Sequence, residues 1–357
     1  MQSKFRLLVV RLGAMGDILH ALPAVTALRM AHPGWVIDWV VEPKWSALLA
    51  AETSAGRDTF SNAPKQPIVD RLHLASTKQW RRTPLASQTR IEIRSLRQAL
   101  KAGDYDTVLD LQGAIRSAVI GRMAGCSCVI GEAEPRERAA RWLYSHQVDI
   151  RGAHVIEQGI ELASAVAGDD LAAVKPWLPV DPAAEVWADE LFAVSPNAPV
   201  ALINPGAGWG AKRWPIERYS AVAKGLVDRG FRVFVNGGPG EEPLLESISQ
   251  QTQGAVVKLN CSLGQLIAVT RRVTLAIAGD TGPLHLACAL GRPVVGIYGP
   301  TDPSRNGPFG TRFKVLRSPQ SRRDHTRHEA PEAGLLTITP EDVLRAAEEL
   351  LYSEAAR

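Results

Sequence analysis

The sequence contains little cysteine. Only four of its 357 residues are cysteine, namely Cys126, Cys128, Cys261 and Cys288. Cys126 and Cys128 form a C-x-C pair, and no second pair follows that could complete a zinc site. Four cysteines in a chain of this length also exclude a small disulfide-bonded scaffold. We therefore expect reduced thiols, which are typical of the cytosol.

Long apolar runs are missing as well. The run over residues 7–10 is too short for the core of a secretory signal, and a glycine-containing turn follows it. No stretch approaches the roughly 18–20 apolar residues that span a bilayer. The sequence therefore predicts a cytoplasmic protein that touches a membrane only at its surface.

The chain has almost no excess of one charge. Its 41 Lys and Arg against 37 Asp and Glu leave a net charge of +4, which is too small to indicate a nucleic-acid partner. The cations are nevertheless unevenly placed, because residues 71–101 contain a single acid, Glu92. The cations there are Arg71, Lys78, Arg81, Arg82, Arg90, Arg94, Arg97 and Lys101, and Arg116, Arg136, Arg138 and Arg141 follow. They form either a solvated helix face or a surface for an anionic substrate.

The length predicts about two domains, and the apolar pattern predicts their class. Short apolar runs expected to be strands (6–11, 36–41, 106–111) alternate with helical patterns (18–28, 114–123). A Pro- and Ala-rich segment over 175–199 predicts a linker that contains one short helix. The alternation then restarts, with strands over 200–204, 231–236, 273–278 and 293–298 and helices over 216–229, 262–272, 282–290 and 340–351. This pattern indicates two α/β halves with parallel sheets.

The first motif, Gly13-Ala14-Met15-Gly16-Asp17, follows the first expected strand. Its glycines permit a tight turn and a close approach of ligand to backbone. Asp17 falls at the start of a helix, where an ionised carboxylate is favoured. Asp17 is therefore either a plain helix cap or a reactive group. The motif lacks the G-x-G-x-x-G pattern of dinucleotide-binding proteins, which disfavours a nicotinamide dehydrogenase.

Two glycine-rich loops follow strands of the second half. Asn204-Pro205-Gly206-Ala207-Gly208, with Lys212 and Arg213 after it, is either a phosphate-binding loop or a tight turn with solvated cations. The G-K-[ST] ending of a P-loop is missing. In the other loop, Glu241 follows the turn over 236–240 and could accept hydroxyl groups of a ribose, unless the turn only caps the next helix.

The most informative motif is Gly279-Asp280-Thr281-Gly282, with His285 one helical turn later. Because a strand is expected to end just before it and a helix to begin near Gly282, the amides of Thr281 and Gly282 would point at an anion. The alternative is a capped helix that carries an incidental histidine. By contrast, Asp104-Tyr105-Asp106 spells a D-x-D metal pattern but precedes its strand, so it lies at the wrong end of the sheet for a ligand site.

Together these motifs resemble the bacterial lipopolysaccharide heptosyltransferases of glycosyltransferase family 9. The resemblance rests on LGAMGDILHALPAV near the start, LINPGAGWGAKRWP in the middle and AGDTGPLHLACALGRPVVGIYGPTDP near the end. The resemblance spans about residues 5–350. Among these enzymes, the sequence most resembles the heptosyltransferase I type. Gly13 and Ala14 replace a serine pair that is common there, and the polar segment 318–331 matches none of the motifs.

The resemblance implies a GT-B fold, in which two Rossmann-like parallel-sheet domains face each other across a cleft. Residues 1–178 would form the acceptor-binding domain, and residues 179–339 the domain that binds the nucleotide sugar. The C-terminal helix, 340–357, would pack back on the N-terminal domain.

The implied reaction moves heptose from ADP-L-glycero-β-D-manno-heptose to the Kdo or heptose of the lipopolysaccharide inner core. The reaction inverts the anomeric centre and needs neither cofactor nor metal. The partners would be the sugar nucleotide and an anionic Kdo-lipid A acceptor at the cytoplasmic face of the inner membrane, and neither a nucleic acid nor a protein partner is implied.

The resemblance also assigns roles to residues. Asp17 matches the general base of the family, and Lys212 matches the lysine that steadies the diphosphate. Donor binding would involve Gly206, Ala207, Glu241, Asp280, Thr281, Gly282 and His285, with Glu241 at the ribose. Acceptor binding would involve Gly16, Arg81, Arg82, Arg116 and Arg136.

Two alternatives remain at this stage. One is another sugar-nucleotide enzyme of GT-B type, such as a hexosyltransferase or a 2-epimerase. The other is a non-catalytic protein that binds a sugar nucleotide, although the presence of both Asp17 and Lys212 argues against it.

Overall fold

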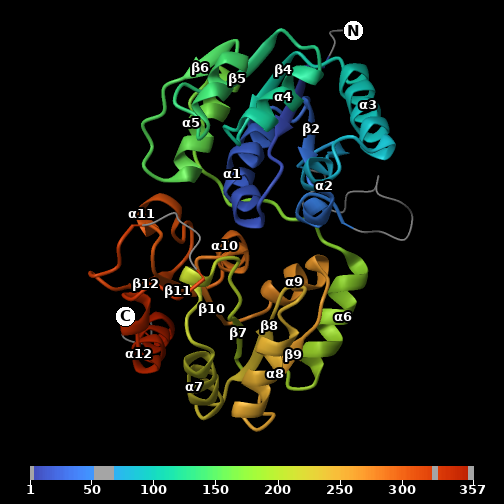
Figure 1. The fold of residues 1–357 in the computed structure, drawn as a ribbon. Helices are drawn as coiled ribbons and strands as arrows, with labels where there is room; N and C mark the ends of the chain where they lie inside the picture. The colour runs from blue at the N-terminus through green and yellow to red at the C-terminus, as the bar shows by residue number, and fades with distance from the viewer. Residues whose placement is uncertain (1–3, 52–67, 324–328, 353–357) are drawn as a thin grey trace. The chain divides into compact units, whose positions relative to one another are not determined.

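The computed structural model describes residues 4–51, 68–323 and 329–352. The chain divides into two compact units, Met1–Val180 and Asp181–Arg357. Each unit contains one six-stranded sheet in which all strand pairs are parallel (Figure 1). The described residues include no helix that is both long and apolar enough to cross a membrane.

The first sheet has the strand order β3-β2-β1-β4-β5-β6. Its strands are β1 (Arg6–Val10), β2 (Val36–Val41), β3 (Arg71–Leu74), β4 (Thr107–Asp110), β5 (Cys128–Glu132) and β6 (His146–Val148). The central strand β1 is apolar and almost wholly buried, because a parallel sheet is covered on both faces.

The helices of the first unit lie between these strands in the chain, apart from the last helix, which follows β6. They are α1 (Met15–Ala31), α2 (Thr77–Arg82), α3 (Ser87–Ala102), α4 (Ile115–Met123) and α5 (Val155–Ala167), with short 3-10 helices η1 (Pro43–Leu48) and η2 (Arg138–Leu143). Helix α1 is buried around most of its circumference and packs against α5. Because its buried side chains anchor it, the loop before α1 has a fixed position at the end of β1.

The second sheet has the order β12-β11-β10-β7-β8-β9. Its strands are β7 (Val200–Asn204), β8 (Arg232–Asn236), β9 (Val257–Leu259), β10 (Leu275–Gly279), β11 (Val294–Tyr298) and β12 (Phe313–Arg317). Counted along each unit, both sheets have the order 3-2-1-4-5-6, which is the order of Rossmann-like nucleotide-binding folds. The prediction of two α/β halves with one architecture is therefore confirmed.

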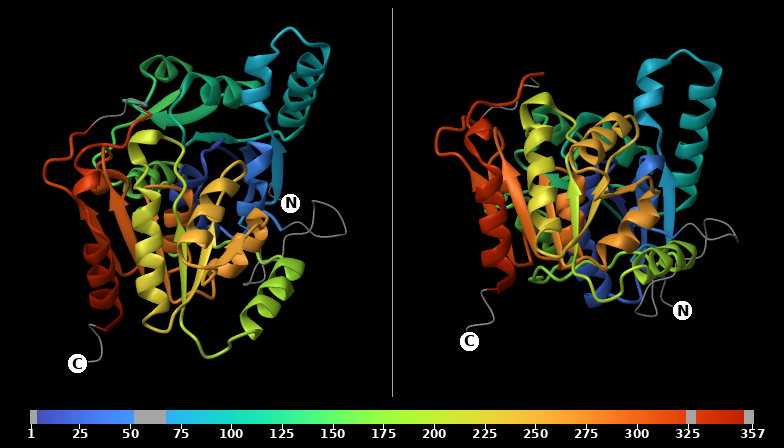
Figure 2. Two further views of the ribbon diagram at one scale, coloured as in Figure 1. Left: turned by 60° about the horizontal axis from the view of Figure 1, so that its bottom comes forward. Right: turned by 90° about the horizontal axis from the view of Figure 1, so that it is seen from below.

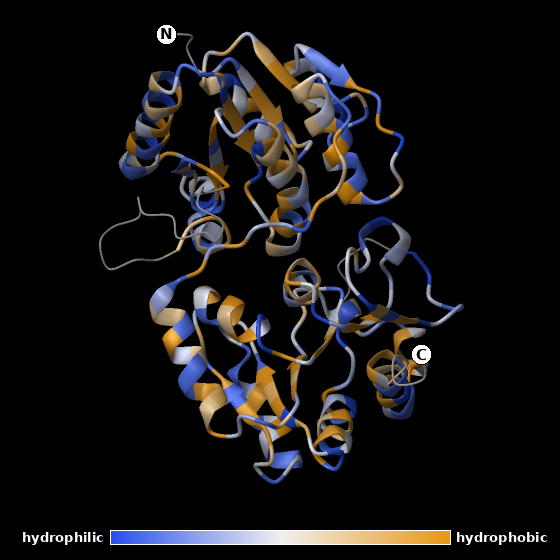
Figure 3. Ribbon diagram, turned by 180° about the vertical axis from the view of Figure 1, so that it is seen from behind, coloured by the Kyte–Doolittle hydropathy of each residue, from blue (hydrophilic) through white to orange (hydrophobic). Residues whose placement is uncertain are grey.

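The helices of the second unit are α6 (Pro182–Ala193), α7 (Ile216–Val227), α8 (Glu242–Gln251), α9 (Leu263–Thr270), α10 (Gly282–Ala289), α11 (Pro303–Asn306) and α12 (Pro340–Tyr352), with η3 (Gly210–Lys212) and η4 (Leu335–Thr337). Figure 2 gives two further views of these layers, and Figure 3 shows that apolar residues concentrate on the strands inside each unit.

The C-terminal helix differs from the expectation. We expected a separate element that packs on the N-terminal domain, whereas α12 belongs to the second unit and packs against α7 and β12. Its apolar side chains, Val343, Ala346, Ala347 and Leu350, are part of the buried core of that unit. The helix stays there because this face would otherwise be exposed to water.

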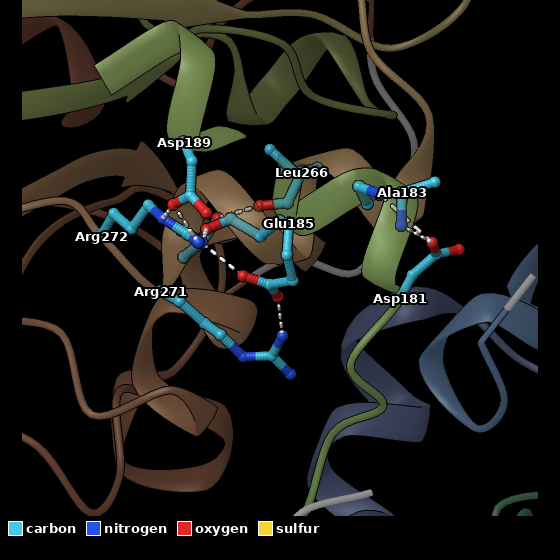
Figure 4. A network of polar contacts seen from close by, with 10 residues as sticks. Asp181, Ala183, Glu185, Asp189, Leu266, Arg271 and Arg272 are labelled. Atoms are coloured by element: carbon cyan, nitrogen blue, oxygen red, sulfur yellow. Dashed lines mark hydrogen bonds and ion pairs between the residues drawn. The ribbon is translucent and has the colours of Figure 1, made fainter. Parts of the chain in front are cut away.

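The helix expected inside the linker, α6, is held to the second unit by an ion-pair network (Figure 4). Glu185 pairs with both Arg271 and Arg272, with an Arg272 Nη1 to Oε2 distance of 2.5 Å. Arg272 also contacts Asp189 at 2.6 Å. Asp181 caps α6 by accepting the backbone N–H of Ala183. The expected linker over 175–199 therefore includes α6, which belongs to the second unit.

Candidate functional site

In each sheet the strand order reverses beside the first strand, between β1 and β4 and between β7 and β10. Ligands of open α/β sheets bind at the carboxyl ends of strands at this reversal. The Asp17 loop follows β1, and the Lys212 and Asp280 loops follow β7 and β10. The predicted motifs therefore form two separate groups, one in each unit, and each lies at the reversal of its own sheet.

In the first unit, Asp17 lies in the first turn of α1, next to Gly16. One carboxylate oxygen accepts the backbone N–H of Ala14 at 2.7 Å, as a helix cap does. The other oxygen pairs with the guanidinium of Arg11 at 2.9 Å. The side chain remains 41% exposed, so the carboxylate is both oriented and accessible to a ligand.

Sequence analysis missed Arg11, the residue that follows β1. Besides its contact with Asp17, Arg11 donates through Nη1 to the carbonyl oxygen of Leu111, which follows β4. It thus joins Asp17 to both strands at the reversal of the sheet. A lone cation at a strand end forms no pattern in a sequence, so only the fold reveals this role.

In the second unit, the half-buried Lys212 forms an ion pair with the buried Asp280. The Lys212 ammonium lies 2.5 Å from Asp280 Oδ2, and it lies 4.7 Å from the centre of the Trp209 ring. Their loops follow neighbouring strands, β7 and β10, which explains why residues 68 positions apart meet. The structure thus brings together two residues that were predicted from separate motifs.

Two more side chains surround the Asp280 carboxylate. His285 Nε2 lies 3.1 Å from Oδ1, and the amide of Asn306 donates at 3.3 Å to both oxygens. Burial alone would raise the pKa of Asp280, but the hydrogen bond from His285 and the charges of His285 and Lys212 hold the pKa well below its usual range. Asn306, from α11, was missed because it carries no local signal.

Thr281 and Gly282 lie at the N-terminus of α10, as predicted. Thr281 is the cap residue and Gly282 the first residue of the helix. The Thr281 hydroxyl donates to the carbonyl of Gly279 at 3.2 Å, so it does not occupy the first free amides of the helix. A helix N-terminus beside the Lys212 ammonium is a favourable place for an anion.

The remaining donor candidates lie at the ends of β7 and β8. The Glu241 carboxylate accepts the backbone N–H of Gly238 at 2.7 Å and lies against Gly206. A Cβ atom at Gly206 would be 2.1 Å from Glu241 Oε2, so this approach requires glycine. Ala207 is buried, and its carbonyl accepts from Arg213 at 3.2 Å.

The structure places the four arginine candidates for acceptor binding in two groups, and all four are exposed. Arg81 and Arg82 end α2, which follows β3. Arg116 lies in the first turn of α4, and the Arg136 backbone packs against Gly113 near the start of that helix.

Arg82 also lines a pocket of about 410 Å³. The other residues that line it are Glu42, Pro43, Lys44, Ser76, Lys78 and Gln79. Burial and the nearby charge of Lys78 lower the pKa of Lys44, as expected where cations gather.

The unmapped segment 318–331 has an anchoring role in its described parts. The backbone of Glu329 lies against Gly210, and Glu332, the residue after the segment, donates from its N–H to the carbonyl of Ala211 at 3.1 Å. Arg323 pairs with Asp302, the cap of α11, at 2.8 Å. The segment therefore contacts the loop that carries Lys212 and the helix that carries Asn306. Its residues 324–328 lie outside the described chain.

The D-x-D sequence lies at the amino end of the first sheet, as predicted. Asp106 accepts the backbone N–H of Arg6 at 2.7 Å, at the start of β1. In the described parts of the chain, no group of three or more His, Cys, Asp or Glu side chains is placed to hold a metal ion.

Two Rossmann-like units, with a carboxylate at one sheet reversal and a cation beside a helix N-terminus at the other, define an α/β protein with the topology of nucleotide-binding folds. Comparison with known proteins narrows this class. The family model of glycosyltransferase family 9 (heptosyltransferase) matches residues 93–335. The chain belongs to this family and is a glycosyltransferase.

Relatives and solved structures agree with this assignment. Lipopolysaccharide heptosyltransferase 1 of Escherichia coli K12 is 30% identical over 322 residues, which cover 88% of this chain and 94% of the relative. The structure of E. coli heptosyltransferase WaaC with ADP is 27% identical, with a TM-score of 0.77, and covers 97% of this chain and 100% of that one. WaaC with ADP-2-deoxy-2-fluoro heptose is 26% identical, with a TM-score of 0.75 and coverages of 97% and 99%. The fold is thus that of the GT-B heptosyltransferases.

Proposed function

We propose that this enzyme transfers heptose from ADP-L-glycero-β-D-manno-heptose to the Kdo or heptose of the lipopolysaccharide inner core. The observation that carries the proposal is the cluster of Lys212, Asp280 and His285 beside the N-terminus of α10. Such a cluster suits a diphosphate, and an E. coli protein with a similar fold, heptosyltransferase WaaC, has a solved structure with ADP. The acceptor would lie at the cytoplasmic face of the inner membrane.

Asp17 serves as the general base in this proposal. Its carboxylate takes the proton of the acceptor hydroxyl while that oxygen bonds to the anomeric carbon of the heptose. The bond between this carbon and the ADP oxygen breaks, and ADP leaves with the electron pair. Attack from the face opposite to ADP inverts the anomeric centre. Arg11 and the N–H of Ala14 hold the carboxylate in place.

The second unit stabilises the leaving group. Negative charge grows on the diphosphate as ADP departs, and the Lys212 ammonium and the first amides of α10 offset it. Asp280 and Asn306 hold Lys212 and His285 in position, and Glu241 binds the ribose. In this proposal protein cations do the work that a divalent metal does in other transferases.

The acceptor candidates keep their proposed role. Arg81, Arg82, Arg116 and Arg136 would contact the anionic Kdo-lipid A, because guanidinium groups bind phosphate and carboxylate through paired hydrogen bonds. Gly16 would allow the acceptor sugar to approach the loop before Asp17.

Ligand-dependent unfolding followed by turnover tests the proposal. ADP at 100 times its Kd should raise the free energy of unfolding by about 2.7 kcal/mol, whereas UDP, GDP and NADH should have little effect. Turnover of ADP-heptose with Kdo-lipid A should then proceed equally well in the presence of a chelator. Stabilisation by UDP but not ADP would favour another GT-B sugar-nucleotide enzyme, and ADP-heptose binding without product would indicate a non-catalytic protein.

A further inference from the structure

Helix α3 carries a row of cations that has no role in the proposed site. Arg90, Arg94, Arg97 and Lys101 are all exposed, and their spacing of four, three and four residues places them on one helix face. None of the four forms an ion pair with a described residue. We call this row the α3 basic stripe.

The packing of α3 fixes the direction of this stripe. Thr89, Leu96 and Leu100 are buried, and Ile93 packs against the core of the first unit. These residues form the adjacent face, so the helix is held by one side and presents the α3 basic stripe to solvent. Figure 2 shows α2 and α3 projecting from the sheet of the first unit.

The one acidic residue of α3, Glu92, already has hydrogen-bond donors away from the α3 basic stripe. Glu92 accepts hydrogen bonds from the Trp80 indole at 2.7 Å and from the Gln88 amide at 2.9 Å. Among the described residues of α2 and α3, Glu92 therefore does not act as a counter-ion for the α3 basic stripe. The positive field remains available for an external anionic partner.

Two large apolar side chains lie beside the stripe. Leu85, between α2 and α3, is 79% exposed, and Ile91 is 58% exposed. The guanidinium of Arg90 donates to the carbonyl of Leu85 at 3.0 Å, and this bond holds Leu85 next to the cations of α3. Cations flanked by exposed aliphatic residues are the composition of helices that lie in a membrane interface.

We propose that the α3 basic stripe, with Leu85 and Ile91, docks the enzyme on the surface of an anionic phospholipid bilayer. The proposal rests on the proposed function, because the acceptor of that reaction is a membrane lipid. A bilayer fits better than a nucleic acid, since exposed aliphatic side chains gain free energy in the headgroup region. Nucleic acids would also be attracted by the cations, but exposed aliphatic side chains gain nothing from a phosphate backbone, and single strands are bound with aromatic stacking in addition.

Sedimentation with vesicles tests the docking. The wild-type enzyme should bind phosphatidylcholine vesicles that contain phosphatidylglycerol, less so at high salt, and should not bind pure phosphatidylcholine. The variant Arg90→Gln/Arg94→Gln/Arg97→Gln should bind on the order of 100-fold more weakly, about fivefold for each cation. The control Arg229→Gln/Lys258→Gln/Lys314→Gln makes the same charge change in the second unit and should keep wild-type binding.

A second pair of variants identifies the partner as lipid. Leu85→Ser or Ile91→Ser should weaken vesicle binding by about tenfold, because an aliphatic group no longer enters the interface. Unchanged binding in both, or equal binding by the stripe variant and its control, would overturn the proposal. Transfer to a soluble Kdo acceptor without lipid chains should be unaffected by all these variants, so a failure of docking is distinguishable from a failure of the proposed reaction.

Discussion

Asp110 and Asp280 occupy nearly the same place in two copies of one topology. Asp110 ends β4, and Asp280 directly follows β10, which is the fourth strand of the second sheet. Both carboxylates are buried. Their neighbours nevertheless differ, because Asp110 contacts neutral hydrogen-bond donors and Asp280 contacts Lys212 and His285. The same topology can therefore hold a buried carboxylate in a structural role or beside cations.

Asp110 is surrounded by neutral donors. It accepts from the backbone N–H of Gln112 and from the hydroxyls of Ser117 and Tyr144, at 2.8–2.9 Å. Burial raises its pKa, and these hydrogen bonds offset only part of the effect. Asp280 faces Lys212 and His285 instead, and its pKa is lowered. Asp110 therefore organises a loop, whereas Asp280 positions cations for an anionic ligand.

The largest effect on the free energy of unfolding should come from replacing the buried carboxylates, and it should differ between Asp280 and Asp110. Asp280→Asn leaves Lys212 and His285 without their carboxylate partner and should cost about 3 kcal/mol or more of stability. Asp110→Asn keeps an acceptor oxygen among neutral donors and should cost about 1 kcal/mol. Urea unfolding of both variants measures the difference, and equal losses would break the comparison.

A smaller effect is expected at the ribose side of the second unit. Gly206→Ala places a Cβ atom where the Glu241 carboxylate lies, so Glu241 must turn away. ADP affinity should fall about tenfold, which corresponds to one lost charge-assisted hydrogen bond. Gly208→Ala is the matched control, because no heavy atom lies within 4 Å of its Cβ position. Calorimetric titration with ADP should therefore separate the two variants, and equal affinities would remove Glu241 from the site.

The smallest effect is a pH dependence with opposite signs in the two units. The lowered pKa of Asp280 contributes stability above the ordinary Asp range, near 3.9, and this stability is lost as pH falls. The raised pKa of Asp110 contributes stability at low pH, which is lost as pH rises through its folded value.

Midpoints of urea unfolding from about pH 3 to pH 7, a range that includes the ordinary Asp pKa, test these signs. On acidification the wild type should lose stability relative to Asp280→Asn and gain stability relative to Asp110→Asn. Parallel pH curves for the wild type and either variant would contradict the electrostatic assignment for that residue.

The sequence predicted the central strands well and the outer strands poorly. Strands β2 and β7 have the bounds expected, because strands buried on both faces are continuous apolar runs. Strands β6 and β9 have three residues each, with polar residues among them, and were not predicted. Helix α12 was predicted along its length, but its packing partner was not, since a helical pattern does not show which core it covers.

In the candidate site, too, some residues could be predicted from the sequence and others could not. Asp17, Lys212, Asp280 and His285 could be predicted because each lies in, or within a few residues of, a glycine-containing segment that follows a strand. The partners of these residues could not. Arg11 and Asn306 contact them through the fold alone, and the segment 318–331 contacts the Lys212 loop from far along the sequence.

Turnover by Asp17→Asn tests the central claim most directly. The asparagine keeps the size of the side chain and the bond from the N–H of Ala14 but cannot take the acceptor proton. With ADP-heptose and Kdo-lipid A, kcat should fall by about 10²–10⁴-fold, while ADP should bind with unchanged affinity. Wild-type turnover by this variant would contradict the assignment of Asp17 as the base of a heptosyl transfer.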